Sequence, residues 1–378
     1  MSLEVQFNSL NIGPTAGPSN SSTGSSRHTD RHQPGQEPPP RYLFRVACPA
    51  SDGQTDTQWV KSKAQYLRDL ERDHRDDRPG VQVAGPEDLL HREDREATAQ
   101  SLIDHLRWRR PEDDNLVSWT SSFLFVAQHV MRRRKGNQQR LEDISVLVVD
   151  TAEFPTGTFT REMNLARPLR EYNNDLSNFC NLENTACRKY PPAHYYNGEY
   201  LSHGALHVQG KCTTVTARDL FDAGLRTLRP DLELDDHSSS AGLAKEICRM
   251  RQAYYHFGYS QNTTTDEQYA AIHNIANLFG RRFYLPMVAN LLGLMPCLLG
   301  GPLLETSVEQ LFPVDKVNYQ EKVEPHLRPV TLQNMHPFVP AHLPEVAQVK
   351  HISRLISCRI AIGESMSKYS REAQGPSH

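Results

Sequence analysis

The sequence predicts an α+β fold, and three observations support this class. Residues 144–149 are apolar almost throughout, which is typical of a strand inside a sheet. Residues 116–120 are β-prone and precede an apolar stretch at residues 123–131 with helical spacing, which indicates a strand followed by a helix. Beyond Ala217 the apolar spacing is helical. Strands therefore dominate the first part of the chain, and helices the last.

A disordered tail is expected before the folded part. Hydrophobic residues make up 38% of the 378 residues, and 25 are proline. The hydrophobic share is below the roughly 45–50% that is usual in globular chains. Residues 1–40 are rich in Gly, Ser, Pro, His and Gln, so they cannot bury enough apolar area to offset chain entropy. We expect disorder at residues 1–40 and 371–378, and a fold that begins at Arg41.

The composition excludes several classes of protein. The formal net charge of −3 gives no overall attraction to nucleic acid or anionic lipid. The basic cluster at residues 132–135 is explained as a charged helix end, so binding of nucleic acid is not expected. Residues 285–304 lack charge, but prolines and Asn290 interrupt them, which favours a buried helical hairpin over a membrane span.

The cysteines and the start of the chain predict a location in the cytoplasm or nucleus. Seven cysteines are scattered without a CxxC pair, which is typical of reduced thiols. The first thirty residues lack the basic start and the apolar stretch of a secretory signal.

The remaining elements follow from the local pattern. Residues 42–46 predict a strand that carries Arg45, and residues 194–207 alternate around Glu199. Residues 59–110 predict a helical, heavily charged, solvated insert, whose recurring apolar positions are Leu89, Leu90, Leu102, Ile103 and Leu106. The helix after residue 120 has Ser121 or Ser122 as its N-cap and ends near Gly136.

Two further regions complete the pass along the chain. Residues 151–192 have no strong period, which indicates long loops with short helices. Residues 220–228, 243–257 and 269–279 predict helices.

Two motifs lack residues that phosphate binding or metal binding requires. Residues 203–213 look like a phosphate-binding loop, but Ala205 and Cys212 stand where glycine and a hydroxyl are needed. His203, His207 and Cys212 have loose spacing and no fourth ligand in view. We therefore expect no metal site.

Strand alternation brings out a set of polar residues. Ser118 and Thr120 share one face of their strand, while Trp119 points to the other. By the same rule, Asn197 and Glu199 share a face. Together with Arg45, three strands each offer polar side chains.

These residues resemble the Arg-Ser-Glu signature of the ADP-ribosyltransferase superfamily: an arginine on a first strand, a Ser-x-Thr strand leading into a helix, and a late strand with glutamate. The segments YLFRV, NLVSWTSSFLF, ISVLVVDT and GEYLSHGAL, which begin at Tyr42, Asn115, Ile144 and Gly198, are similar to a fungal domain family of unknown function that shares this signature. The resemblance covers about residues 41–215 in order.

The resemblance implies that residues 41–215 form a split β-sandwich of ADP-ribosyltransferase type, which contains a helical insert. Residues 216–370 would then form a helical C-terminal extension. NAD is then the substrate, with an unknown acceptor, expected to be a protein. Arg45 would hold the NAD phosphates, and Ser118 would support the nicotinamide ribose and orient Glu199. Thr120 would brace its strand, with Asn197 also in the cofactor site. Glu199 would stabilise the positive charge that grows on the ribose as nicotinamide leaves.

The chain also departs from the superfamily pattern. Asn197 stands where many members have Glu or Gln, and asparagine cannot act as a base. Trp119 replaces a middle threonine. The alternative function is therefore a catalytically inactive module of the same fold that binds a protein partner through its helical C-terminal part.

Overall fold

A computed structural model describes residues 38–73, 93–136, 138–183, 185–232, 240–255, 264–296, 302–312 and 343–373. Most of the expected N-terminal tail lies outside these residues. The fold begins just before Arg41, because the Thr151 hydroxyl donates a 2.8 Å hydrogen bond to the carbonyl oxygen of Pro40. At the other end, the last helix continues to Ala373, into the segment 371–378 that was expected to be disordered.

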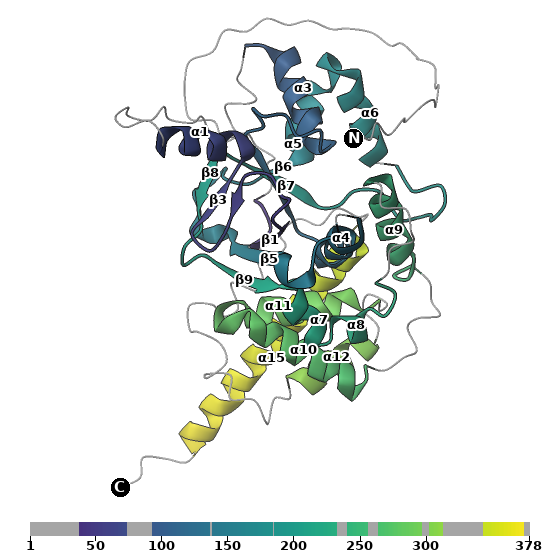
Figure 1. Cartoon of the computed structure of the whole chain (residues 1–378). Coiled ribbons are helices and arrows are strands. Elements are labelled where there is room, and N and C mark those ends of the chain that lie inside the picture. Colours follow the sequence, from purple (N-terminus) through teal and green to yellow (C-terminus); the bar gives the residue numbers. More distant parts are fainter. Residues whose placement is uncertain are drawn as a thin grey trace, which may run out of the picture. The chain divides into compact units, whose positions relative to one another are not determined.

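Two antiparallel sheets form the β part of the fold (Figure 1). The larger has the strand order β6-β7-β4-β1-β5-β9, and the smaller has the order β2-β3-β8. The strands of the larger sheet are β1 (Tyr42–Ala47), β4 (Leu116–Thr120), β5 (Ser145–Asp150), β6 (Thr160–Arg161), β7 (Glu199–His203) and β9 (Cys212–Thr216). Those of the smaller sheet are β2 (Gln54–Thr55), β3 (Trp59–Lys61) and β8 (Ala205–His207). Sheets combined with helices confirm the α+β class.

The larger sheet is apolar on both faces because its central strands alternate between two cores. On β1, Phe44 belongs to the core that α4 (Phe123–Gly136) covers, whereas Leu43 belongs to the core beneath the smaller sheet. Trp119 and Tyr200 lie in this second core. Strands β1 and β5 can therefore be apolar in nearly every position. The buried, interior position of β5 confirms its prediction.

The segment at residues 59–110 differs from its prediction. Its helices α1 (Lys63–Asp73) and α3 (Arg95–Leu106) are present, but strand β3 was missed, as was β2 just before the segment, because two or three residues are too short to show a period. The segment is also less solvated than expected. Leu102, Ile103 and Leu106 pack in a core with α5 (Glu162–Leu169) and α6 (Asn174–Glu183). Leu89 and Leu90 lie outside the described residues.

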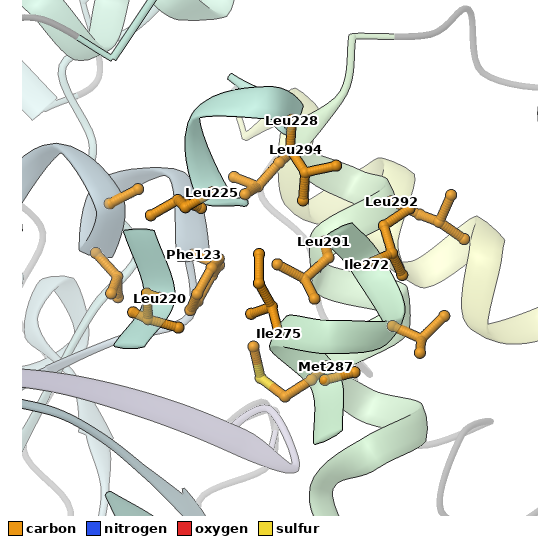
Figure 2. Packing of buried hydrophobic residues seen from close by; sticks show 14 of the residues in the cluster. Phe123, Leu220, Leu225, Leu228, Ile272, Ile275, Met287, Leu291, Leu292 and Leu294 are labelled. Carbon is orange, nitrogen blue, oxygen red and sulfur yellow. The ribbon is translucent and has the colours of Figure 1, made fainter. Parts of the chain in front are cut away.

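The C-terminal helices pack directly on the larger sheet. One core cluster runs from β1 through α4 to Ile360 of the last helix. Figure 2 shows Phe123 of α4 close to Leu220 and Leu225, with Ile272, Met287 and Leu291 further along the same cluster. The helices are α7 (Ala217–Asp222), α8 (Leu225–Leu228), α9 (Ser240–Gln252), α10 (Asp266–Leu278), α11 (Gly280–Leu294), α12 (Pro302–Leu311) and α15 (Pro344–Ala373).

Helix α11 contains the first half of the uncharged stretch at residues 285–304. It is buried from Phe283 to Leu294 and packs against α10 and α15. Residues 297–301, within the expected hairpin, lie outside the described residues. Among the residues that are described, no helix is both long and apolar enough to cross a membrane.

Candidate functional site

Ser118 and Glu199 lie on neighbouring strands and on one face of the larger sheet. In the register of β4 and β7, Thr120 pairs with Glu199 and Ser118 with Leu201, so the side chains of Ser118, Thr120 and Glu199 share a face. Helices α3, α5 and α6 cover this face. Burial raises the pKa of the Glu199 carboxyl, while the charge of His105 and a hydrogen bond from Ser118 lower it in part. The two side chains are thus neighbours on this face.

A hydrogen-bonded chain continues from Ser118 into helix α3. The Oγ atom of Ser118 lies 2.8 Å from Nε2 of His105, and Nδ1 of His105 lies 2.8 Å from Oδ2 of Asp114. Oδ1 of Asp114 also accepts a 3.0 Å hydrogen bond from the backbone of Leu116. Asp114, His105 and Ser118 therefore form one hydrogen-bonded line, and Glu199 lies beside its Ser118 end.

The line restricts where protons lie. A carboxylate only accepts, so Nδ1 of His105 must carry a hydrogen toward Asp114. Nε2 of His105 then faces the Ser118 hydroxyl, which is therefore held between His105 and the neighbouring Glu199.

Two more carboxyl groups face the same site. Glu162 at the start of α5 is 1% exposed, and Glu183 at the end of α6 is 8% exposed. Neither Glu162 oxygen has a hydrogen-bond partner, nor does Oε2 of Glu183. Burial raises the pKa of Glu162 well above its usual range, and raises that of Glu183 to about 8, with the charge of Glu199 as a further cause. The pKa of about 8 favours the protonated form of Glu183 at neutral pH.

The raised pKa of Glu183 predicts a pH-dependent stability. Between about pH 4.5 and 8, the unfolded chain releases this proton while the folded protein keeps it, so stability falls as pH rises. Glutamine imitates the protonated acid. We expect Glu183→Gln to melt close to the wild type at pH 5 and at a higher temperature at pH 8. Glu171→Gln, on an exposed position, should follow the wild type throughout. Parallel wild-type and Glu183→Gln curves would contradict the assignment.

Arg45 sits on the neighbouring strand but on the other face. Its partner on β5 is Leu147, a residue of the core beneath the smaller sheet. Strands β1 and β4 pair only at Phe44 and Thr120, and Arg45 fills the position where they part. Its Nη1 donates a 2.9 Å hydrogen bond to the backbone oxygen of Ser118, and Nε donates to the Thr55 hydroxyl at 3.0 Å. The side chains of Ser118 and Glu199 thus meet, whereas Arg45 reaches only the backbone of Ser118.

Thr120 and Asn197 take part in holding the loop before β7. The Thr120 hydroxyl donates a 2.8 Å hydrogen bond to the backbone oxygen of Asn197 and accepts one from the backbone of Ser122. Oδ1 of Asn197 is buried without a hydrogen-bond partner. Gly198 has a φ of +70°, and a Cβ there would lie 2.5 Å from the Ser121 hydroxyl. Glycine is therefore required just before Glu199.

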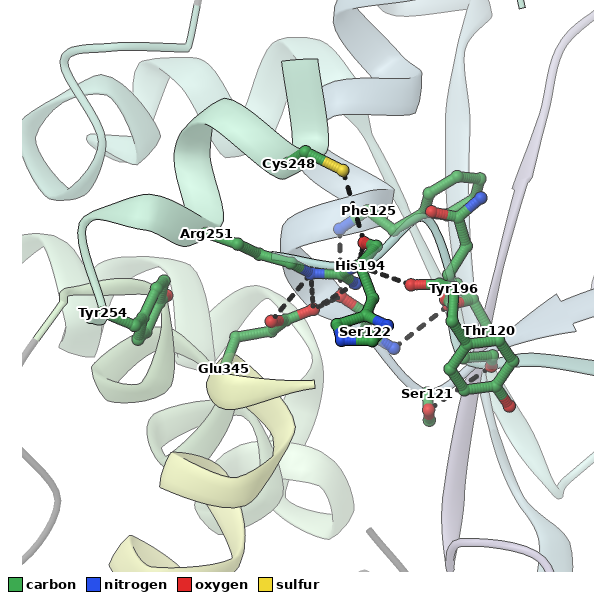
Figure 3. Close-up of polar contacts among 12 residues, drawn as sticks. Thr120, Ser121, Ser122, Phe125, His194, Tyr196, Cys248, Arg251, Tyr254 and Glu345 are labelled. Atoms are coloured by element: carbon green, nitrogen blue, oxygen red, sulfur yellow. Dashed lines mark hydrogen bonds and ion pairs between the residues drawn. The ribbon is translucent and has the colours of Figure 1, made fainter. Parts of the chain in front are cut away.

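A buried ion pair fixes the same loop from the helical side (Figure 3). Arg251 of α9 and Glu345 of α15 are 0% and 3% exposed, and their closest atoms are 2.7 Å apart. Glu345 also accepts a 2.7 Å hydrogen bond from Ser122, and Arg251 donates to the backbone oxygens of His194 and Tyr196. Ser122 in turn caps α4 by accepting from the backbone of Phe125. The C-terminal helices therefore hold the strand that carries Glu199.

Several of these groups were not predicted from the sequence. His105, Asp114, Glu162 and Glu183 have no motif spacing, and they meet only through the packing of α3, α5 and α6 on the sheet. A helical histidine nine residues before an aspartate was the only available signal. Among the described residues, no group of three or more His, Cys, Asp or Glu side chains is arranged to hold a metal ion.

Comparison with known proteins gives one similarity, which covers part of the chain. No curated protein and no solved structure matches the chain. Residues 38–205, which include Arg45, His105, Ser118 and Glu199, are similar to a family described as a domain of unknown function (DUF7587).

Proposed function

We propose that the protein is an NAD-dependent enzyme of ADP-ribosyltransferase type, acting as a mono-ADP-ribosyltransferase or an NAD glycohydrolase. The observation that carries this proposal is the order of Glu199, Ser118 and Arg45 on the adjacent strands β7, β4 and β1. The sequence resemblance likewise expects the arginine, the serine and the glutamate on three different strands. The contact of Ser118 with Glu199 supports the proposal further.

In the proposed reaction, the bond between ribose and nicotinamide breaks and positive charge develops on the ribose ring. The Glu199 carboxylate stabilises this charge more than it stabilises the ground state, which is the condition for catalysis. Ser118 orients the carboxylate, and the His105–Asp114 pair keeps Ser118 in position. Water or an acceptor, expected to be a protein, then receives the ADP-ribosyl group.

Arg45 has a smaller part in this proposal than the resemblance implies. Two of its donors are engaged by Thr55 and by the Ser118 backbone. Its positive charge remains beside the β4 strand, where it favours a ligand phosphate. We therefore assign it to binding and to holding the parted strands, with no contact to the ribose.

The proposal is tested by incubating the full chain with NAD labelled in its nicotinamide, with and without a cell extract as a source of acceptors. Released nicotinamide is expected in both, and label from adenine-labelled NAD is expected on protein in the second if the enzyme is a transferase. A raised melting temperature in millimolar NAD is also expected, since a ligand that binds only the folded state stabilises it. No release, no transfer and no shift would instead favour the inactive interaction module.

The Ser118–His105–Asp114 line favours a second candidate, a serine hydrolase. Its two distances of 2.8 Å match those between nucleophile, base and orienting acid in acyl-transfer enzymes. The contact with Glu199 weighs against it, because a carboxylate beside the hydroxyl competes for its proton. Labelling by a fluorophosphonate probe that disappears in Ser118→Ala would favour the hydrolase, whereas an unlabelled wild type would remove it.

A further inference from the structure

Helix α4 ends in arginines that fold back onto aromatic rings. The guanidinium carbon of Arg132 lies 4.4 Å from the centre of the Trp108 ring. His129 stacks on Trp108, with ring centres 5.5 Å apart and planes 12° from parallel. Nε of Arg133 donates a 3.2 Å hydrogen bond to Nε2 of His129. These contacts fix two guanidinium groups in place, which an ordinary charged helix end does not need.

The charges in this region are of one sign and close together. Burial lowers the pKa of Arg45 and of Arg132 to about 10, and the charge of Arg133 lowers both further. Burial lowers the pKa of Arg133 itself, and Arg110 contributes. His129 is held neutral because burial and the same arginines keep its pKa well below its usual range. It can therefore accept from Arg133, but it brings no charge of its own.

The acidic groups nearby do not balance this charge. Asp52 and Asp114 act on Arg45, and Asp52 acts with Cys48 on Arg133. Asp52 is engaged by Arg110 at 3.2 Å, and Asp114 by His105. Nη1 of Arg132 is buried and has no hydrogen-bond partner. Buried donors and charges without a partner cost free energy, which a bound anion would offset.

We propose that Arg132 and Arg133, with Arg45 beside them, form a binding site for the phosphate or diphosphate group of a small molecule. Guanidinium groups recognise phosphate through paired hydrogen bonds, and Trp108 and His129 hold them ready to do so. Arg45, on which the charge of Arg133 acts, contacts the Ser118 backbone, so the site lies near the strand that carries Ser118. A ligand held here by its phosphate can present its remaining part toward that strand. The site itself requires no turnover of NAD.

Binding of inorganic pyrophosphate to the full chain, measured by calorimetry at constant ionic strength, tests the proposal. We expect one site in the wild type, and a loss of affinity of about a hundredfold in the double variant Arg132→Gln, Arg133→Gln, or about tenfold for each arginine. The matched control is Arg134→Gln, Lys135→Gln, which removes two exposed charges from the same helix end. Its affinity should stay within about twofold of the wild type.

Further measurements show whether the double variant still folds and which part of the ligand the site binds. Without ligand, the Arg132→Gln, Arg133→Gln variant should melt no lower than the wild type, because it loses repulsion between like charges. ADP should bind at least as tightly as pyrophosphate, and adenosine should not bind.

Absence of pyrophosphate binding by the wild type, or an equal loss in the two double variants, would overturn the site. Binding of adenosine as tight as that of ADP, or of RNA that depends on Arg134 and Lys135 alone, would also overturn it. Pyrophosphate binding without nicotinamide release would leave the site standing and remove only the proposed enzyme.

Discussion

Replacement of Glu345 by alanine is expected to lower the free energy of unfolding by about 3–5 kcal/mol, the cost of leaving one partner of a buried ion pair alone. Arg251 is fully buried and would lose the carboxylate with which it pairs. Ser122 would lose the acceptor of its hydroxyl at the start of α4. Urea unfolding followed by circular dichroism measures the loss.

Two further variants serve as controls for Glu345→Ala. Arg354→Ala, on an exposed position of the same helix, should change the stability by no more than about 0.5 kcal/mol. The double change Arg251→Met, Glu345→Met removes both charges and should be less damaging than Glu345→Ala alone. A small effect of Glu345→Ala would show that α15 does not hold the loop before β7.

Glu199→Gln is expected to lower kcat for nicotinamide release by about a hundredfold to a thousandfold, as loss of one group that stabilises a transition state does. The amide has nearly the same size but carries no charge, so binding of NAD should change little. Assays with labelled NAD measure kcat and the affinity for NAD in the wild type and in the variant. Glu171→Gln, on an exposed position, serves as the control and should keep full activity.

The pH profile gives an independent check on the same residue. The reaction needs Glu199 as a carboxylate, and burial raises the pKa of this group above its usual value. Turnover by the wild type should therefore rise with pH on the acid side, with its midpoint above about 4.5. If Glu199→Gln retains both turnover and this acid limb, the catalytic group lies elsewhere.

Much of the fold could be predicted because local patterns carry it. The apolar strand β5, the strand-to-helix step at Ser122 and the end of α4 at Gly136 each follow from residues close in sequence. Strands β2 and β3 could not be predicted in this way. They are too short for a period, and they exist because β3 pairs with β8 and β2 pairs with β3.

The site was predicted only in part for a related reason. Alternation places Ser118 and Thr120 on one face of β4, but the face of Arg45 depends on how β1 pairs with β4 and β5. That register is a tertiary property, and it turns Arg45 toward Leu147 and the smaller sheet. His105 reaches Ser118 only because α3 packs over β4. No local pattern could have revealed that contact.

The central claim is that Glu199 and its hydrogen-bonded line act on the ribose of NAD. A crystal structure of the Glu199→Gln variant with NAD bound tests it most directly, because this variant should bind the dinucleotide without cleaving it. The account predicts that the 2′-hydroxyl of the nicotinamide ribose lies within about 2.6–3.2 Å of the side chain at position 199, with Ser118 still bonded to His105. A dinucleotide bound away from β4 and β7, or a site that stays empty at saturating NAD, would contradict it.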